Sequence, residues 1–192
     1  MFIPSHFKGA GDAMAFISRH SFGQLISAID GKIACTHLPF LAAEGGLLTG
    51  HLARANPQAQ LPEGAQITCV FSGAHGYISP SWYTEPGVPT WNYEAVHLQG
   101  RLRWVDDEAQ ATEILVALSR HYEASLPTPW EPVFNERLVK AIRAFHVEVV
   151  DVAFKQKLSQ NRTLDDRLRV IETLRNRGDI ELAEAMAALL AK

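Results

Sequence analysis

The stretch from Gly50 to Pro57 holds the clearest candidate for binding an anion. It reads Gly-His-Leu-Ala-Arg-Ala-Asn-Pro, so that a strand end is followed by a cation, an amide and a turn. Arg54 can donate two parallel hydrogen bonds to a phosphate, and backbone N–H groups at a helix start would add donors. An isolated arginine on a loop is, however, more often a solvated side chain. Phosphate binding is therefore one of two interpretations of this stretch.

A second polar run, residues 157–162, reads Lys-Leu-Ser-Gln-Asn-Arg and follows the last predicted strand. Donors at the end of a strand can line the mouth of a pocket. A flavin ring has a row of carbonyl and ring-nitrogen acceptors along its edge, which such donors would suit. The same run equally suits the start of the next helix, with Asn161 or Thr163 as its N-cap.

Residues 75–94 concentrate aromatic rings between prolines at 80, 86 and 89, which restrict the backbone. Large flat rings on a stiffened loop suit a surface that receives a flat ligand or another subunit. The alternative is that the rings only cover one end of a β core. The rings belong to Tyr77, Trp82, Tyr83, Trp91 and Tyr93.

Four histidines lie on or beside predicted strands: His37, His51, His75 and His97. Imidazole binds metals and titrates near neutrality, so a metal or proton-transfer site is one interpretation. The spacing matches no zinc motif, and dispersed histidines are more often hydrogen-bonded scaffold residues. The chain also lacks the Gly-x-Ser-x-Gly, Gly-x-Gly-x-x-Gly and Walker motifs. We therefore predict no metal site and name no catalytic residue.

The composition fits one globular domain, with 192 residues, a hydrophobic share of 47% and a net charge of −3. A negative net charge gives no electrostatic attraction to DNA. There is no apolar run long enough for a bilayer, and the N-terminus lacks the basic-then-apolar order of a signal peptide. We expect a cytoplasmic protein without membrane contact. Cys35 and Cys69 lie in apolar runs and are expected to be buried free thiols, although neighbouring strands could pair them.

Strand and turn signals dominate the first 105 residues. A short helix is predicted at 12–20, followed by strands at 22–29 and 32–38 joined by Asp30-Gly31, a strong hairpin signal. Further strands are predicted at 47–52, 65–73 and 95–105. A turn is expected at 44–46 and a short helix after Asn56-Pro57.

From residue 106 the apolar spacing becomes helical. One helix is predicted to open at residues 106–108, a second to span 133–144, and a last strand to cover 145–154. Two tail helices meet at Gly178-Asp179. The residues expected to face the core are Ala111, Ile114, Leu115, Leu118 and Tyr122, then Leu138 and Ile142, and in the tail Leu164, Leu168, Ile171, Leu182, Met186 and Leu189. Together the elements predict an α+β protein, a small antiparallel barrel with peripheral helices.

Several blocks, in order, resemble the PaiB-type FMN-binding transcriptional regulators. The resemblance runs from residue 1 to about 162, and its Trp-Tyr, Pro-Thr-Trp-Asn-Tyr and Lys-Leu-Ser-Gln-Asn blocks are specific in combination. The blocks are Met-Phe-Ile-Pro at the start, Thr36–Pro39, Gly50–Ala53 with Asn56–Gln58, Tyr77–Tyr83, Val88–Tyr93 and Lys157–Asn161.

The resemblance implies an antiparallel split β-barrel related to the pyridoxamine-phosphate-oxidase-like flavoproteins. We expect the FMN-binding split-barrel domain at residues 1–162 and a C-terminal helical appendage at 163–192. Such proteins are usually homodimers that bind FMN in the groove between the subunits.

The resemblance also implies which residues face FMN. Arg54 and Asn56, with His51 nearby, would hold the phosphate, and the backbone around Thr36 and His37 would approach the ring. The residues that would close the site, some from the partner chain, are Trp91, Asn92, Tyr93, Lys157, Ser159, Gln160 and Asn161.

Three functions fit these expectations. The first is an FMN-binding negative transcriptional regulator, for which DNA contact rests on family analogy alone, since a fold never fixes a function. The second is an FMN-dependent oxidoreductase or flavin reductase acting on a small molecule, with His37 or His75 delivering protons. The third keeps the barrel but binds haem, with histidine ligands, or no cofactor.

Overall fold

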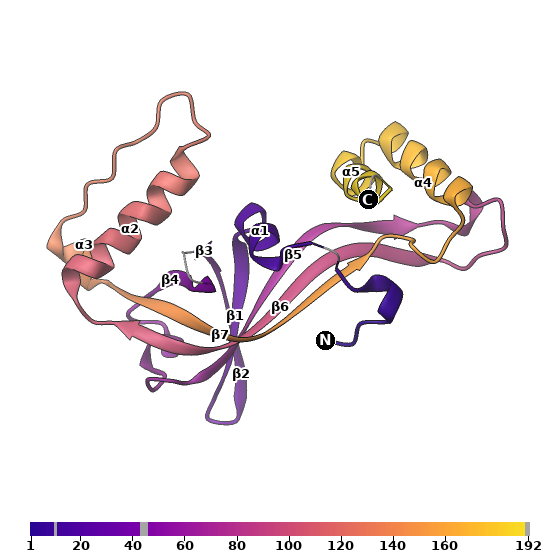
Figure 1. Cartoon of the computed structure of the whole chain (residues 1–192). Coiled ribbons are helices and arrows are strands. Elements are labelled where there is room, and N and C mark those ends of the chain that lie inside the picture. The colour runs from indigo at the N-terminus through magenta and orange to yellow at the C-terminus, as the bar shows by residue number, and fades with distance from the viewer. Residues whose placement is uncertain (10, 43–45, 191–192) are drawn as a thin grey trace. The chain divides into compact units, whose positions relative to one another are not determined.

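The computed structural model describes residues 1–9, 11–42 and 46–190. The strands form one seven-stranded sheet in the order β2-β1-β5-β6-β7-β4-β3 (Figure 1). They are β1 Phe22–Ile29, β2 Lys32–Pro39, β3 Leu41–Ala42, β4 Leu48–Ala53, β5 Gln66–Ile78, β6 Thr90–Val105 and β7 Ile142–Lys157. The helices are α1 Ala13–Arg19, α2 Glu108–Glu123, α3 Glu136–Lys140, α4 Leu164–Arg177 and α5 Ile180–Ala188, with short 3-10 turns η1 Ser5–Phe7, η3 Pro57–Gln60 and η4 Pro80–Trp82.

The chain divides into two compact units. Unit 1 consists of residues 1–13, 72–96 and 153–192, and unit 2 consists of residues 14–71 and 97–152. The long strands β5, β6 and β7 contribute residues to both units. The boundary predicted between residues 162 and 163 stays a prediction, and most of the turn predicted at 44–46 lies outside the described residues.

The hairpin at the start of unit 2 forms as predicted. Strands β1 and β2 pair antiparallel from Phe22 opposite Pro39 to Ile29 opposite Lys32. Asp30 and Gly31 have φ angles of 49° and 74°, which is the left-handed backbone that a tight two-residue hairpin requires. The turn fixes the register, and with it the side chains that β1 and β2 direct to each face of the sheet.

The helix predicted from residue 106 is α2. Asp107 is its N-cap, and its carboxylate accepts a hydrogen bond from the Gln110 N–H at 2.9 Å. Four of its five predicted core residues are buried: Ala111, Ile114, Leu115 and Leu118. The fifth, Tyr122, is 41% exposed, because its hydroxyl reaches the Ser21 hydroxyl at 2.7 Å instead of entering the core.

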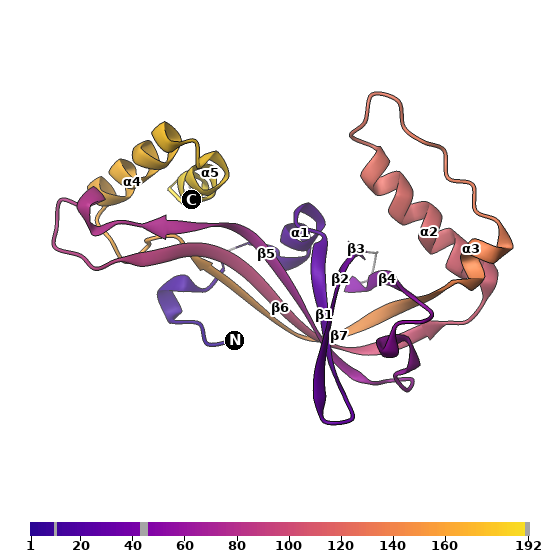
Figure 2. The ribbon, with the colours of Figure 1, turned by 180° about the vertical axis from the view of Figure 1, so that it is seen from behind.

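The helix predicted at 133–144 is mostly wrong. Only α3 is helical there, and β7 begins at Ile142 because its first residue pairs with Ala53 of β4 (Figure 2). The face of α3 is also different from the prediction. Leu138 is 51% exposed, and Val139 is the residue that packs into the unit 2 core. The apolar residues of this segment therefore belong to a short helix and a strand, not to one long helix.

In unit 1, α4 and α5 pack together over the strand residues Ala74 and Ile78. Thr163 is the N-cap of α4, and Gly178 ends it with φ +86°, as the sequence predicts. The predicted stripe on α4 is wrong at Leu164 and Leu168, which are 60% and 49% exposed. The buried face of α4 is formed by Asp166, Val170, Ile171 and Leu174, so it is rotated about the helix axis relative to the predicted face.

The aromatic stretch is partly strand, not one long loop. Strand β5 continues to Ile78 and β6 begins at Thr90, so the connection covers only residues 79–89. Tyr77, Trp91 and Tyr93 therefore stand on strands, where neighbouring side chains alternate between faces. Tyr77 and Trp91 are exposed and meet edge to face at 6.3 Å between ring centroids, while Tyr83 is buried.

Both cysteines are free, but only one is buried as predicted. Cys35 is exposed on the edge strand β2, whereas burial raises the pKa of the Cys69 thiol to about 12. Cys69 is therefore an inert core residue. No helix in the described part of the chain is long and apolar enough to cross a membrane.

Candidate functional site

A closed polar network surrounds the start of η3 in unit 2. The Asn56 side chain accepts from the Gln58 N–H at 2.9 Å, which caps η3. Its amide group also donates to the Thr36 hydroxyl at 2.9 Å, and that hydroxyl donates to the Gln58 side-chain oxygen. Two predicted site residues, Asn56 and Thr36, are thus brought together, but each is held by protein partners. These hydrogen bonds hold the loop, and the predicted contact of both residues with FMN stays a prediction.

Gln58 is the residue that the site prediction missed. It is 1% exposed, and its amide nitrogen donates to the Ser27 hydroxyl at 2.9 Å and to the Leu25 carbonyl at 3.2 Å. A buried amide with all its partners ties η3 to β1 and β2. The Asn-Pro-Gln sequence could have indicated this residue. An Asn cap followed by proline at the first helical position fixes the direction of the next side chain.

Arg54 lies just before η3 and is anchored at one end only. Its Nε donates to the Lys140 carbonyl at 3.1 Å, and its backbone N–H donates to the Ala141 carbonyl at 2.9 Å. Both contacts aim the side chain and leave the two terminal guanidinium nitrogens without a partner in the described residues. Paired N–H groups in this arrangement match a phosphate or carboxylate.

The two predicted histidines of unit 2 have different surroundings. His51, on β4, is half-buried, its Nδ1 atom has no partner in the described residues, and burial lowers the pKa of its imidazole. His37 is exposed on β2, and its Nε2 lies 2.9 Å from the Gln24 amide nitrogen. An amide nitrogen only donates, so His37 Nε2 is the acceptor in this contact.

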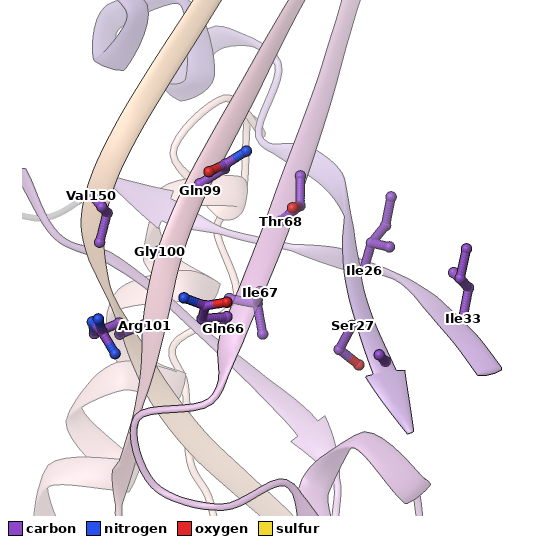
Figure 3. A pocket seen from close by; sticks show the side chains of 11 residues that line it. Ile26, Ser27, Ile33, Gln66, Ile67, Thr68, Gln99, Gly100, Arg101 and Val150 are labelled. Carbon is purple, nitrogen blue, oxygen red and sulfur yellow. The ribbon is translucent and has the colours of Figure 1, made fainter. Parts of the chain in front are cut away.

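A hollow of unit 2 lies along the strands β1, β2, β5, β6 and β7 of the sheet (Figure 3). It encloses about 340 Å³, which is within the size range of small-molecule sites. Its polar side chains come from the neighbouring strands β5 and β6, and Ser27 connects it to the Gln58 network. None of its lining residues was among the predicted site residues. They are Ile26, Ser27, Ala28, Ile33, Gln66, Ile67, Thr68, Gln99, Gly100, Arg101 and Val150.

The remaining predicted residues belong to unit 1, where Asn92 and Ser159 form a buried pair. The Asn92 amide donates to the Ser159 hydroxyl at 2.9 Å and to the Met186 sulfur at 3.4 Å. Ser159 has φ +65°, a conformation that costs a non-glycine residue free energy. The strand end is therefore held in a strained turn by side-chain hydrogen bonds.

Lys157 and Gln160 bracket that turn. The Lys157 ammonium donates to the Thr90 hydroxyl and to the Trp91 carbonyl at 2.8 Å. Burial lowers its pKa, the neighbouring Lys155 adds to this effect, and Tyr93 opposes it. The Gln160 side-chain amide bridges the turn. Its oxygen accepts from the Leu158 N–H at 2.7 Å, and its nitrogen donates to the Gln156 carbonyl.

The three other predicted residues of unit 1 reach solvent to different degrees. Trp91 is 55% exposed, Tyr93 lies with its ring centroid 5.3 Å from the Lys155 ammonium, and Asn161 is exposed at a pocket edge. The predicted site residues from Thr36 to Asn56 thus lie in unit 2, and those at 91–93 and 157–161 lie in unit 1. Across the described residues, no group of three or more His, Cys, Asp or Glu side chains is arranged to hold a metal ion.

Residues 1–151 match the family model described as "Putative FMN-binding domain". The chain is 36% identical to Protease synthase and sporulation protein PAI 2 of Bacillus subtilis, over 99% of this chain and 96% of that protein. It is 29% identical to an uncharacterised protein of Aspergillus fumigatus, over 82% of this chain and 83% of that one.

Solved structures support the predicted fold. The FAD and heme binding protein of Mycobacterium smegmatis superposes with a TM-score of 0.64 at 14% identity, over 81% of this chain and 74% of that one. The flavocytochrome Anf3 of Azotobacter vinelandii gives 0.63 at 19% identity, over 84% and 75%. At such identities the match shows the fold alone. The prediction of an α+β antiparallel split barrel is confirmed. The chain belongs to the PaiB-type family of FMN-binding-domain proteins.

Proposed function

We propose that the chain binds FMN and that unit 2 holds the FMN phosphate at Arg54. The observation that carries the proposal is the guanidinium anchored at Nε, with both terminal nitrogens left for a bidentate contact. The terminal N–H groups of Arg54 fit a phosphate. The adjoining Asn56 and Thr36 side chains keep the loop that carries Arg54 in one conformation. A fixed cation costs less ordering entropy on binding than a mobile one.

The ring of FMN would lie in the hollow of unit 2, between β1, β5 and β6. Gln66, Thr68 and Gln99 supply hydrogen-bonding groups there, and Ile26 and Val150 supply apolar area (Figure 3). Strand β2 stands at the edge of the sheet, so backbone groups on its open side are available to ring carbonyls, as expected for the backbone around Thr36 and His37. Bound flavin would supply redox chemistry, and the chain would orient it and exclude water.

The seven predicted residues of unit 1 are not included in this proposal. Four of them form side-chain hydrogen bonds within unit 1 and Asn161 lines a pocket formed by residues of unit 1, so the assignment of all seven to FMN stays a prediction from the resemblance. They are Trp91, Asn92, Tyr93, Lys157, Ser159, Gln160 and Asn161.

The working form would be a homodimer. Unit 2 exposes large apolar side chains on the face of its sheet that carries the hollow, where Ile33 is 82% exposed and Val150 is 65% exposed. Exposed apolar area of this kind is typical of a protein interface. A second copy on this face would cover it and close the hollow over the ring. Light scattering of the wild type and of Ile33→Lys tests this: the variant is expected to be monomeric, and a wild type that is already monomeric would contradict the dimer.

The biological role would be that of a negative regulator of transcription in the cytoplasm. Membership of the PaiB-type family and the sporulation protein of Bacillus subtilis support the role, and the exposed free thiol of Cys35 suits a reducing compartment. DNA retention that falls steeply with salt would support regulation. Steady turnover of a nicotinamide cofactor, without DNA retention, would favour the oxidoreductase alternative.

The first experiment is an absorption spectrum of the protein before and after incubation with FMN and removal of the excess. Retained flavin bands in the wild type, lost in Arg54→Ala, are the expected result. A Soret band would favour haem instead. Lack of retained flavin under every condition would contradict the proposal.

A further inference from the structure

Unit 1 contains a pocket of about 160 Å³ whose walls differ sharply in chemistry. Phe7, Tyr83 and Val88 make one side apolar, and Lys157 and Arg162 bring two cations to the other. A cavity of about 150 Å³ is large enough for benzene. The pocket therefore has room for one ring or a branched chain with a charged head. No carboxylate side chain lines it.

The two cations are held in place but are not neutralised inside the pocket. Lys157 donates to the Thr90 hydroxyl and the Trp91 carbonyl, which leaves one ammonium proton. The Arg162 guanidinium donates to the Pro86 carbonyl at 3.1 Å and lies 4.2 Å from the centroid of the Tyr83 ring. Neither forms a salt bridge with a carboxylate in the described part of the chain.

Asp166, which interacts electrostatically with Arg162, already accepts hydrogen bonds from another residue. Asp166 is buried, and one of its carboxylate oxygens accepts from the Thr84 N–H and the Thr84 hydroxyl, each at 2.7 Å. These hydrogen bonds, with a smaller contribution from the charge of Arg162, lower the pKa of Asp166. The charge of Arg162 is thus only partly balanced, and the pocket keeps a positive field.

The pocket floor is rigid. Asn92 and Ser159 line it, and both are almost fully buried in the hydrogen-bonded turn described above. Gly87 packs closely against two of the lining residues, because a Cβ there would lie 2.6 Å from the Tyr83 ring and 2.8 Å from the Arg162 guanidinium. A strained, close-packed wall around two cations is typical of a binding site.

We propose that this pocket binds a small organic monocarboxylate, with the carboxylate between Lys157 and Arg162 and the apolar body against Phe7, Tyr83 and Val88. Such a ligand would be an effector or a substrate of the protein. The inference does not rest on flavin binding, because every residue that it uses lies in unit 1 and the proposed phosphate contact lies in unit 2.

Benzoate is the probe, and benzamide, which has the same shape without the charge, is its matched control. Titration of the full-length protein by calorimetry is expected to show benzoate binding at least tenfold more tightly than benzamide. Lys157→Met and Arg162→Met should each weaken benzoate at least tenfold. Lys155→Met removes a nearby lysine that does not line the pocket, and should change the affinity less than twofold.

A second variant covers the case in which a cation variant fails to fold. Val88 is 68% exposed, so Val88→Trp can fill the pocket from outside without disturbing the core. It should abolish benzoate binding while the melting temperature stays unchanged. Equal affinity for benzoate and benzamide, or no benzoate binding to the wild type, would overturn the inference.

FMN titration of the same variants separates this pocket from the flavin site. Lys157→Met should retain wild-type FMN affinity while it loses benzoate, and Arg54→Ala should do the reverse. If Lys157→Met loses FMN as well, the pocket belongs to the flavin site and the inference is wrong. If Arg54→Ala retains FMN while benzoate behaves as expected, the proposed phosphate contact fails and the inference stands.

Discussion

The two units use polar side chains in opposite ways. In unit 2, Asn56, Thr36 and Gln58 satisfy one another, and the far end of the neighbouring Arg54 side chain is left for a ligand. In unit 1, Lys157 and Arg162 remain only partly balanced in a pocket with an apolar wall. Of the residue blocks that resemble the family, the one around Asn56 therefore holds a loop in position, whereas the one around Lys157 lines a pocket. Motif membership alone does not separate the two.

The largest expected effect is on stability, from breaking the unit 2 network. Gln58→Leu would leave the buried Ser27 hydroxyl without its partner and the half-buried Thr36 hydroxyl without its acceptor, at a cost of about 3 kcal/mol in the free energy of unfolding. Urea denaturation measures it. Gln60→Leu, two residues along the same turn but exposed, is the matched control and should change stability by less than about 0.5 kcal/mol. Equal effects of the two variants would mean that the network does not stabilise η3.

A smaller loss is expected from removing the cap. Asn56→Ala deletes the acceptor of the Gln58 N–H and should cost about 1 kcal/mol. Its FMN affinity should fall as well, because Arg54 would lose its fixed position. Asn161→Ala in unit 1 is the counterpart, and since Thr163 caps α4, it should leave denaturation unchanged. If Asn161→Ala lost as much stability as Asn56→Ala, the predicted difference between the structural roles of these two residues would be wrong.

The two units should also differ in how acid affects them. Burial lowers the pKa of His51 in unit 2, so the unfolded chain binds the proton more tightly, and unfolding becomes easier as pH falls below about 6.5. The pKa of Asp166 in unit 1 is lowered by its hydrogen bonds, so its contribution is present above about 3.9 and is lost only at lower pH. In stability measured from pH 7 to 3, the first decline should be smaller in His51→Gln, with a remainder from His97, whose pKa burial also lowers, and the second decline should be smaller in Asp166→Asn. The same profile in His51→Gln and wild type would contradict the first assignment.

The smallest stability effect is expected at Lys157. Removing a partly desolvated charge offsets the loss of two hydrogen bonds, so Lys157→Met should change the free energy of unfolding by less than about 1 kcal/mol. A loss as large as that of Gln58→Leu in the same denaturation series would show that Lys157 is a structural residue.

Much of the fold could be predicted because local signals agree with the tertiary structure. The Asp30-Gly31 hairpin turn, the helix start at residues 106–108 and the helix end at Gly178 were each predicted from local residues, and each forms. Leu138, Leu164 and Leu168 could not be placed, because a helix with apolar residues on two faces gives no rule for which face packs against the core. The β7 start at Ile142 depends on pairing with β4, which no local pattern specifies.

The candidate site was predicted less completely. The blocks identify the loops that hold Arg54 and Lys157, but not the partner of each side chain. Thr36 and Asn56 turned out to bind each other, and Gln58 was missed, since hydrogen-bond partners distant in sequence leave no trace in spacing. The hollow of unit 2 was missed for the same reason: its side chains come from five strands.

The phosphate contact is tested most directly by comparing the affinities of FMN and riboflavin, which differ only in the phosphate. The wild type is expected to bind FMN at least tenfold more tightly than riboflavin, as expected for one bidentate arginine contact. Arg54→Ala should bind both ligands equally, while Arg162→Ala, an arginine of unit 1, should keep the wild-type ratio. A ratio that survives in Arg54→Ala, or one that is lost in Arg162→Ala, would contradict the assignment of the phosphate to unit 2.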